Sequence, residues 1–462
     1  MSDPPQSKFN YPLIGDSWKF ISSPGLWSRE LAKQCDVVRA YIRGLNGMKY
    51  TTVYHLCGNE ALRAFYDEET VVRGLVHSPL DSYMFGDWLD VTPKMNRGSH
   101  KERKAILLKA IHSTESVNRF LNTVGLFTDE FIESLKSRIL PFGVPTIILL
   151  NFHIRNFCAQ VTAKYLWSYD VNEKLIEKFY NINSDLSEKP INCPIFNFYD
   201  GLEGARWLLN FTRKRLIEHQ TFQDQYNDTL QLLINATPRL TDDEIITEIN
   251  YLFYVINGIS SIVSGAILLL CKNKNTEVFS KTMKEIESNL TFLQSYDASI
   301  LTDDFVRKNF PYLENVVKET IRIYPIEPLK FGTVIRDTII KGFIIPKGSV
   351  VAAGLWANGF NEERYPDPDS LRPERYEQEI KDTENGFDWT PFGGGQLFQS
   401  HRCAGQEAVL RTCTYLLARL LSTFDFTLIN LNQSFDYSKW VSRPKDELPI
   451  KIQLKAMSGG QD

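Results

Sequence analysis

The chain of 462 residues lacks several features that would place it in other classes of protein. It has no apolar run of the roughly 18 residues that a transmembrane helix needs, and its polar start carries no signal peptide. We therefore expect a cytoplasmic protein without a transmembrane anchor, while peripheral membrane contact, or an anchor trimmed from the start, stays open. A formal net charge of −4 at pH 7 gives no basic surplus, which argues against a nucleic-acid partner.

The chain also lacks linkers and a cysteine framework. No long Ser/Gly/Pro tract, like-charge block or internal repeat divides it, so we expect a single unit over residues 1–462, although length alone favours about two or three domains. Its seven cysteines show no metal-finger spacing, and their odd number favours a reducing compartment. With 43% hydrophobic residues, a chain of this length can bury a substantial core.

Helical periodicity dominates what is present. The longest apolar helical pattern covers residues 242–272, with Thr241 as its candidate N-cap. Alternation over residues 39–57 predicts a hairpin that turns at Asn46-Gly47. Short strands are also predicted, so that the expected mainly α protein has β-rich parts at about 37–58, 331–355 and 424–456. These further strands are expected at residues 343–346, 350–353, 426–429 and 450–454.

The most informative feature is the stretch 391–405, in which a glycine-rich loop runs into Cys403. An apolar helical run over residues 408–424 follows at once, so we expect this cysteine at a helix N-terminus, where the dipole and the peptide N–H groups stabilise a thiolate. A buried thiolate is costly unless a cation neutralises it, and iron does so. Haem iron held by cysteine gains electron density that favours O–O cleavage.

This loop resembles the haem loop of the cytochrome P-450 superfamily, Phe-x-x-Gly-x-(Arg/His)-x-Cys-x-Gly. The matching residues are Phe392, Gly395, His401, Cys403 and Gly405. The resemblance implies a large helical region around haem b (iron protoporphyrin IX), a smaller β-rich region, and Cys403 as the metal ligand. Seven residues separate Gly395 from Cys403, where the usual pattern has three. Longer loops here resemble those of the fatty-acid peroxygenases and of the allene oxide synthases.

A second pair of motifs agrees with this resemblance. Glu319 and Arg322 stand at i, i+3 in a helical stretch that Pro325 ends, and share a face of that helix. Together with Arg375, in a Pro-Glu-Arg segment, they resemble the family's Glu-x-x-Arg helix and its partner. The resemblance implies a buried, ion-paired structural triad, whose bidentate contacts fix geometry more than they add stability.

The long central helix carries a departure from the family. Oxygen-activating members have (Ala/Gly)-Gly-x-(Asp/Glu)-Thr there, and its acid and hydroxyl relay protons to dioxygen. The matching stretch here is Asn257-Gly258-Ile259-Ser260-Ser261. Ser261 can replace the threonine, but Ser260 cannot act as an acid at neutral pH. We expect an impaired relay, which a peroxide does not need because it arrives already reduced.

Asn257 keeps two interpretations. The fatty-acid peroxygenases have an arginine at this position that binds the substrate carboxylate, and asparagine lacks that charge. The hydroperoxide-rearranging branch has an asparagine, whose amide would bond or steer a hydroperoxide. Alternatively, Asn257 bonds a helix carbonyl, and Gly258 opens a small groove for substrate.

Partners for the haem propionates are predicted from the stretch 99–104, which resembles the family's propionate-facing helix. Arg103 is the first candidate, His100 the second and His401 the third; a plain surface role for His100 stays open. The family often has an arginine in the strand after Glu-x-x-Arg. Phe331 and its neighbours stand there instead, so a further propionate contact is not assigned.

These features together predict a haem-thiolate oxidoreductase. We expect it to oxidise or rearrange a lipid, namely a fatty acid or a fatty-acid hydroperoxide, by a peroxide-dependent route. A conventional monooxygenase that acts on a hydrophobic small molecule with a reductase is the first alternative. A non-catalytic haem or lipid carrier that kept the fold is the second, because a fold alone does not choose a function.

Overall fold

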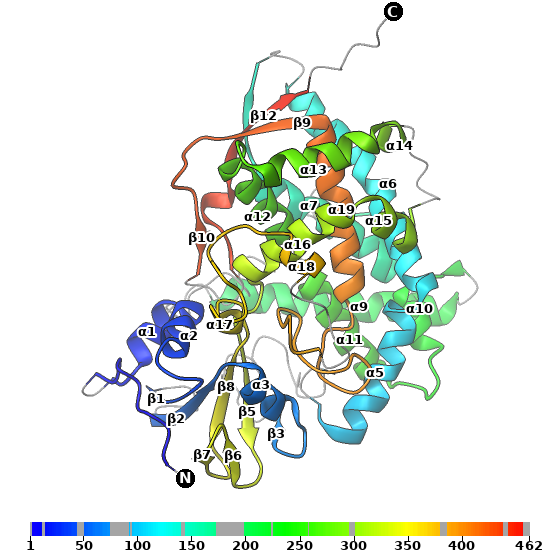
Figure 1. The fold of residues 1–462 in the computed structure, drawn as a ribbon. Coiled ribbons are helices and arrows are strands. Elements are labelled where there is room, and N and C mark those ends of the chain that lie inside the picture. Colours follow the sequence, from blue (N-terminus) through cyan, green and yellow to red (C-terminus); the bar gives the residue numbers. More distant parts are fainter. Residues whose placement is uncertain are drawn as a thin grey trace, which may run out of the picture.

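Helices make up most of the chain, and a five-stranded sheet lies beside its N-terminal end (Figure 1). The protein is represented by a computed structural model. The residues that it describes are 2–11, 14–43, 50–73, 92, 95–139, 144–171, 198–222, 225–256, 258–294, 301–378, 386–437 and 442–455.

The five-stranded sheet has the order β1-β2-β8-β5-β3. Its strands are β1 (Val37–Arg43), β2 (Tyr50–Leu56), β3 (Val71–Val72), β5 (Leu329–Val334) and β8 (Val350–Gly354). β1 and β2 form the antiparallel hairpin predicted from alternation, with Arg43 opposite Tyr50. The predicted turn at Asn46-Gly47 lies outside the described residues. β8 pairs with this hairpin in parallel and with β5 on its other side, so residues 297 positions apart, such as Val53 and Val350, meet in one sheet.

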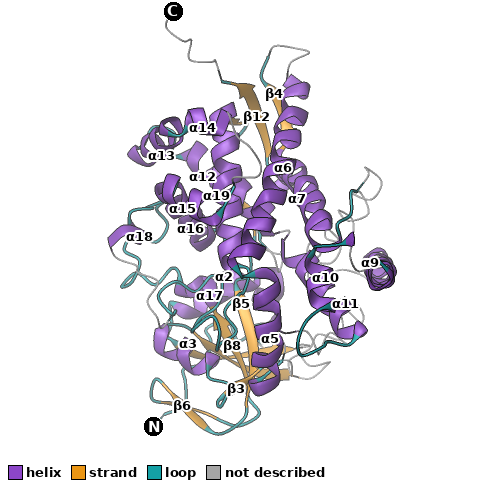
Figure 2. Cartoon of the chain, turned by 90° about the vertical axis from the view of Figure 1, so that its right-hand side faces the viewer, coloured by secondary structure: helices purple, strands orange, loops and turns teal. Residues whose placement is uncertain are grey.

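Three smaller sheets complete the strand content of the described residues. They are β6 (Thr338–Ile340) with β7 (Phe343–Ile345), β4 (Thr146–Leu149) with β12 (Pro449–Leu454) and β9 (Phe424–Leu428), and β10 (Phe435–Asp436) with β11 (Arg443–Pro444). The strands predicted at 343–346, 350–353, 426–429 and 450–454 are therefore confirmed within two residues. β4 was not predicted, because its short apolar run continues directly into a helix and becomes a strand only by pairing with β12. β4 and β12 lie at the end of the molecule opposite to the five-stranded sheet (Figure 2).

The helices follow the predicted periodicity. They are α1 (Ser17–Ser22), α2 (Pro24–Ala32), α3 (Asn59–Tyr66), α5 (Arg97–Ile111), α6 (Thr114–Ile139), α7 (Leu150–Trp167), α9 (Phe198–Thr221), α10 (Thr229–Ile234), α11 (Asp242–Ile256), α12 (Gly258–Lys272), α13 (Glu277–Ser288), α14 (Leu290–Gln294), α15 (Asp303–Asn309), α16 (Pro311–Ile323), α17 (Leu355–Asn358), α18 (Arg375–Gln378) and α19 (Gln406–Thr423), with a short 3-10 turn η6 (Lys445–Glu447).

α11 and α12 form the predicted central helix. Thr241 and Glu244 make a reciprocal cap at its start: the Thr241 Oγ1 accepts from the Glu244 amide at 3.3 Å, and the Glu244 carboxylate accepts from the Thr241 amide at 2.7 Å. The predicted N-cap is thereby confirmed. By length and composition this helix, among the described residues, qualifies as a candidate membrane span, but its apolar window is wholly buried inside the protein.

The largest core lies where α12 packs against α7, α16 and α19. Ile262, Ala266 and Leu416 are completely or almost completely buried there. The helix is therefore apolar on all sides because other helices surround it. This packing brings together two helices that carry or adjoin predicted site residues: α12, which contains Ser260 and Ser261, and α19, which follows Cys403.

Candidate functional site

Cys403 stands three residues before the first residue of α19, Gln406, after the glycine-rich loop. Its amide donates to the Phe392 carbonyl at 2.9 Å, which fixes where the loop returns to the helix. Gly393 and Gly395 have φ values of +89° and +86°, a left-handed conformation that favours glycine. A side chain at Gly405 would meet only the Cys403 Sγ, at 3.9 Å, among the described atoms. The helix N-terminus therefore presents a flat, open backbone next to the thiol.

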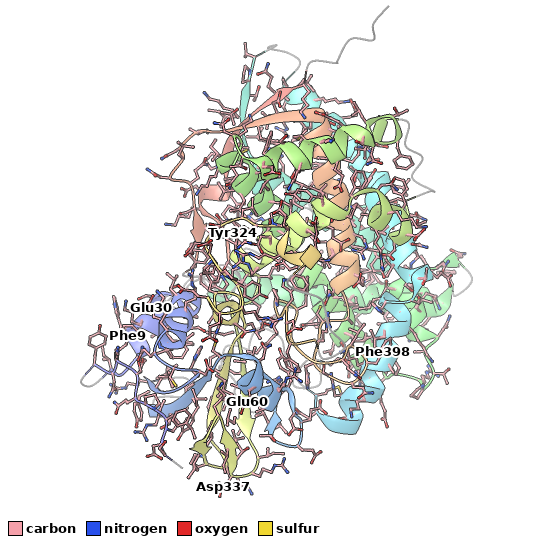
Figure 3. The ribbon with its side chains drawn as sticks, viewed as in Figure 1. Phe9, Glu30, Glu60, Tyr324, Asp337 and Phe398 are labelled. Carbon is pink, nitrogen blue, oxygen red and sulfur yellow. The ribbon has the colours of Figure 1, made fainter. Side chains whose placement is uncertain are left out.

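The four extra residues before Cys403 form a closed turn. The Ser400 amide donates to the Gln396 carbonyl at 2.9 Å, and the Ser400 hydroxyl contacts the carbonyls of Gly394 and Gln396, both at 2.8 Å. The insertion thus leaves and rejoins the loop at nearly the same place. It projects Phe398, 67% exposed, toward the end of α5, where the ring lies 6.2 Å from that of His112 (Figure 3).

Lys104 holds this loop from α5. Its buried ammonium donates to the Ser400 carbonyl and, at 2.7 Å, to the Arg402 carbonyl. Burial raises the pKa of the Cys403 thiol, whereas the Gly405 backbone and the Lys104 charge oppose that rise. Burial also lowers the pKa of Lys104 to about 8, and the charge of Cys403 works against that shift. A buried cation and a potential thiolate are therefore held near each other in a half-buried loop.

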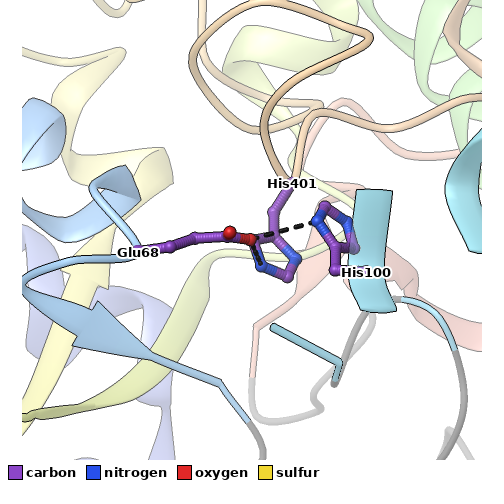
Figure 4. Close-up of side chains that lie close together, drawn as sticks. All are labelled: Glu68, His100 and His401. Atoms are coloured by element: carbon purple, nitrogen blue, oxygen red, sulfur yellow. Dashed lines mark ion pairs between the residues drawn. The ribbon is translucent and has the colours of Figure 1, made fainter. Parts of the chain in front are cut away.

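His100 and His401 stack on each other beside this lysine. Their ring centroids are 3.9 Å apart and the planes differ by 12°. The Glu68 Oε1 lies 3.0 Å from both the His100 Nδ1 and the His401 Nε2 (Figure 4). Burial lowers the pKa of His100 to about 3 and that of His401 to about 2, so both imidazoles are neutral at neutral pH. These three side chains are also a geometric candidate for a metal ion, because their ligand atoms lie within 4.8 Å of one another.

Arg73 is a site residue that the sequence did not single out. Its buried guanidinium lies 3.7 Å from the Phe65 ring centroid, and its Nη1 is 3.5 Å from the Phe331 carbonyl. Its charge lowers the pKa of His401, together with the charges of Lys104 and Lys330. The strand position that lacks the family's arginine is thus approached by a cation from another segment. No local pattern marks Arg73, since only the sheet pairing of β3 with β5 brings it here.

Arg103, the first candidate for the haem propionates, contacts two carboxylates of the central helix. Its guanidinium contacts Glu244 and, at 3.4 Å, the Glu248 Oε1, so it ties α5 to the start of the central helix. Glu248 is fully buried and also accepts from the amide and hydroxyl of Thr92, at 2.9 and 2.6 Å. The propionate role of Arg103 stays a prediction. Lys104, the next residue in the chain, points toward the Cys403 loop.

The central helix turns its two predicted relay residues in different directions. Gly258 lies against Ile326, whose Cδ1 would be 2.9 Å from a Cβ at that position. Ser261, three residues on, shares the face of Gly258. Ser260 is adjacent to Ser261, so its side chain points about 100° away from that of Ser261 around the helix. Both serines are buried. Asn257 lies outside the described residues, so its role stays a prediction.

Glu319, Arg322 and Arg375 come together in the buried interior. The Arg322 Nε and Nη2 donate to the two carboxylate oxygens of Glu319, both at 2.8 Å, and the Arg375 Nε donates to the Oε1 at 3.1 Å. The Tyr376 hydroxyl adds a contact at 3.1 Å. Arg322 also donates to the Gly359 carbonyl at 2.9 Å, so the network joins α16 to the end of α17.

Known proteins agree with this arrangement. A family model described as Cytochrome P450 matches residues 92–452, well over half of the chain. The chain belongs to the cytochrome P450 family. This P450 is 27% identical over 366 residues to the "Putative cytochrome P450 120" of Synechocystis, with 76% of this chain and 77% of that protein covered. It is 22% identical over 441 residues to cytochrome P450 26A1 of Danio rerio, with 90% and 86% covered.

Some curated matches are partial. Cytochrome P450 3A29 of Sus scrofa is 28% identical over 254 residues, and the match spans 48% of that relative. For cytochrome P450 83A1 of Arabidopsis thaliana the match spans 32%. The chain thus spans about half or less of the length of these relatives.

Solved structures show the same fold. This P450 aligns with retinoic acid-bound cyanobacterial CYP120A1 at a TM-score of 0.79 and 22% identity, covering 98% of this chain and 100% of that one. It aligns with P450EX alpha (CYP152N1), solved with myristic acid, at a TM-score of 0.75 and 16% identity, again covering 98% and 100%. The expectation of a P450 fold is confirmed.

Membership of the family implies a haem cofactor. The residues of this P450 fit such a group. Cys403 offers a thiol at the open N-terminus of α19, and a cluster of imidazoles and cations suited to haem carboxylates lies nearby. In that cluster, the nitrogens His100 Nδ1 and His401 Nδ1 and Nε2 are buried without a well-aligned hydrogen bond.

Proposed function

We propose that this P450 is a haem-thiolate enzyme that oxidises or rearranges a fatty acid or fatty-acid hydroperoxide by a peroxide-dependent route, with haem b held by Cys403. The observation that carries the proposal is the position of Ser260. It stands where oxygen-activating relatives have an acid, and its side chain is buried in the helix core. A peroxide supplies both oxygen atoms already reduced, so a route that starts from peroxide has no need of that acid.

Each of these residues would have its own role toward the cofactor. Haem held by a thiolate supplies electron density that favours cleavage of an O–O bond. Cys403 would hold the iron, with the α19 dipole and the Lys104 ammonium stabilising the thiolate charge. Lys104 would also keep the loop in place through two carbonyl contacts. Ser261 is the hydroxyl on the Gly258 face that remains available to hold or pass a proton.

An apolar carboxylic acid is the substrate class that we favour. Two solved relatives were determined with retinoic acid and with myristic acid, and each of these ligands is an apolar molecule that ends in a carboxyl group. The alignments with both structures cover 98% of this P450. Gly258 lies against the side chain of Ile326, and we expect the substrate chain to pass beside this contact. A larger residue at Gly258 would have to displace Ile326. This contact would limit how a substrate approaches the central helix.

A conventional, reductase-dependent monooxygenase is the second candidate. Ser261 favours it, because a hydroxyl stands at the position of the family's threonine, and so do the curated relatives, which are mostly ordinary P450s. The ordered turn that projects Phe398 on the Cys403 side argues for the peroxide route, because an electron donor would have to dock around it.

One comparison on haem-loaded protein separates the two candidates. The enzyme would receive hydrogen peroxide with myristic acid, then a fatty-acid hydroperoxide alone, then NADPH with a reductase and myristic acid. Our proposal expects products in the first or second reaction and none in the third. Turnover with NADPH and a reductase alone would contradict it. Ser260→Asp is the matched variant: it restores the acid, and should raise the NADPH-driven rate without raising the peroxide-driven one.

A further inference from the structure

Glu68 lies in a turn whose position is fixed. The carbonyl of Asp67 accepts from the amides of Thr70 and Val71, at 2.9 and 2.8 Å, and the Asp67 carboxylate accepts from the Glu69 amide at 3.1 Å. This turn joins α3 to β3 at the edge of the five-stranded sheet. It places the Glu68 carboxylate beside His100 of α5 and His401 of the cysteine loop (Figure 4). Both histidines are distant from Glu68 in the sequence.

The surroundings of the histidine pair are built for a carboxylate. Arg73 and Lys104 are both buried and both interact electrostatically with Glu68. Lys330 adds a third cation near His401. Imidazole N–H groups, a guanidinium and an ammonium are donors that suit carboxylate oxygens. The chain's own acid therefore lies 3.0 Å from the imidazole nitrogens that would face the haem carboxylates.

A metal ion is a weaker explanation of the same three side chains. Zinc lies about 2.0–2.1 Å from each imidazole nitrogen, along a lone pair in the ring plane. The two rings are nearly parallel, at 12°, with centroids 3.9 Å apart. An ion between them would lie well out of both planes, so at least one ring would have to leave the stack. An oxygen acceptor fits the stacked pair, because the Glu68 Oε1 lies 3.0 Å from a nitrogen of each ring while the rings stay parallel.

We propose that Glu68 is an internal competitor for the haem carboxylates, which makes it a residue that weakens haem retention in this enzyme. A haem carboxylate brought to His100 and His401 meets a like charge, and one of the two must give up the shared donors. Carboxylates that share one site disfavour each other's charged forms. The inference rests on haem binding and not on which oxidant the enzyme uses.

The test measures haem loss from the loaded enzyme, by transfer to an excess of apomyoglobin. Glu68→Gln keeps the size of the side chain and removes its charge, so we expect haem to dissociate about fivefold to tenfold more slowly than from the wild type. Glu68→Ala should change the rate in the same direction. His100→Ala should accelerate the loss, because it removes a donor and leaves the competitor.

Glu69→Gln is the matched control. It makes the same change of charge one residue away on an exposed side chain, and it should leave the rate unchanged. An unchanged or faster loss of haem from Glu68→Gln would overturn the proposal, as would an unaffected rate in His100→Ala. The proposal would also be overturned if the purified wild type held one equivalent of zinc and Glu68→Gln held none. That result would assign the three side chains to a metal ion. None of these measurements uses an oxidant, so their failure is distinct from failure of the peroxide route.

Discussion

Replacing Glu319 by alanine tests the buried ion network at its centre. This carboxylate is fully buried and receives both the bidentate contact of Arg322 and the single contact of Arg375. The amide of Arg372 and the hydroxyl of Tyr376 also donate to it, at 3.2 and 3.1 Å. The variant therefore leaves two buried guanidinium groups without their shared counter-charge.

The size of the effect follows from burial and chain length. Removing one partner from a buried ion pair costs about 3–5 kcal/mol. An unfolding entropy of about 2.1 cal/mol/K per residue gives roughly 1 kcal/mol/K for 462 residues. The variant should therefore melt about 3–5 °C below the wild type. Because α16, which carries Glu319, packs against α12 and α19, the ratio of haem to protein should fall as well.

Thermal melting followed by circular dichroism, with the absorbance ratio of haem to protein, measures both effects. Glu130→Ala is the control, since it removes an exposed glutamate from the middle of α6 and should shift the melting temperature by less than about 1 °C. A Glu319→Ala protein with wild-type melting temperature and full haem content would refute the structural role of the triad.

Three further predictions follow from individual residues. Cys403→Ala should lose the red-shifted Soret band of the reduced carbon monoxide complex, and a normal band in that variant would remove Cys403 as the iron ligand. Asn257→Ala should change the rate or the product ratio with a lipid hydroperoxide more than it changes haem content. Asn257→Arg should improve peroxide-driven oxidation of a free fatty acid. Unchanged kinetics and products in both variants would show that Asn257 is a plain helix residue. Burial raises the pKa of the Glu248 carboxyl from 4.5 to about 7, so the folded protein holds this proton more tightly than the unfolded chain. The wild type should therefore lose stability relative to Glu248→Gln as the pH rises from about 4.5 to about 7, and parallel melting curves across that window would contradict the assignment.

Several parts of the site were predicted from sequence because they depend on neighbours in the chain. The N-cap at Thr241 depends on the residues next to it, and the pairing of Glu319 with Arg322 requires one turn of helix. The cysteine at the start of α19 requires a glycine loop followed by an apolar helical run. Such patterns are short, so the sequence contains them completely.

Other parts were decided only by the tertiary structure. Arg103 and Lys104 are adjacent, yet successive residues of a helix point about 100° apart, and the packing of α5 sends Arg103 to Glu244 and Lys104 to the cysteine loop. The same rotation separates Ser260 from Ser261.

The sequence by itself therefore determined the family, the ligand-bearing loop and the helices that carry the site. Sheet pairing and helix packing decided that Glu68, Arg73, His100 and His401 meet, although they come from segments up to about 330 residues apart. No local pattern encodes these contacts, because each depends on how distant elements bury their apolar faces.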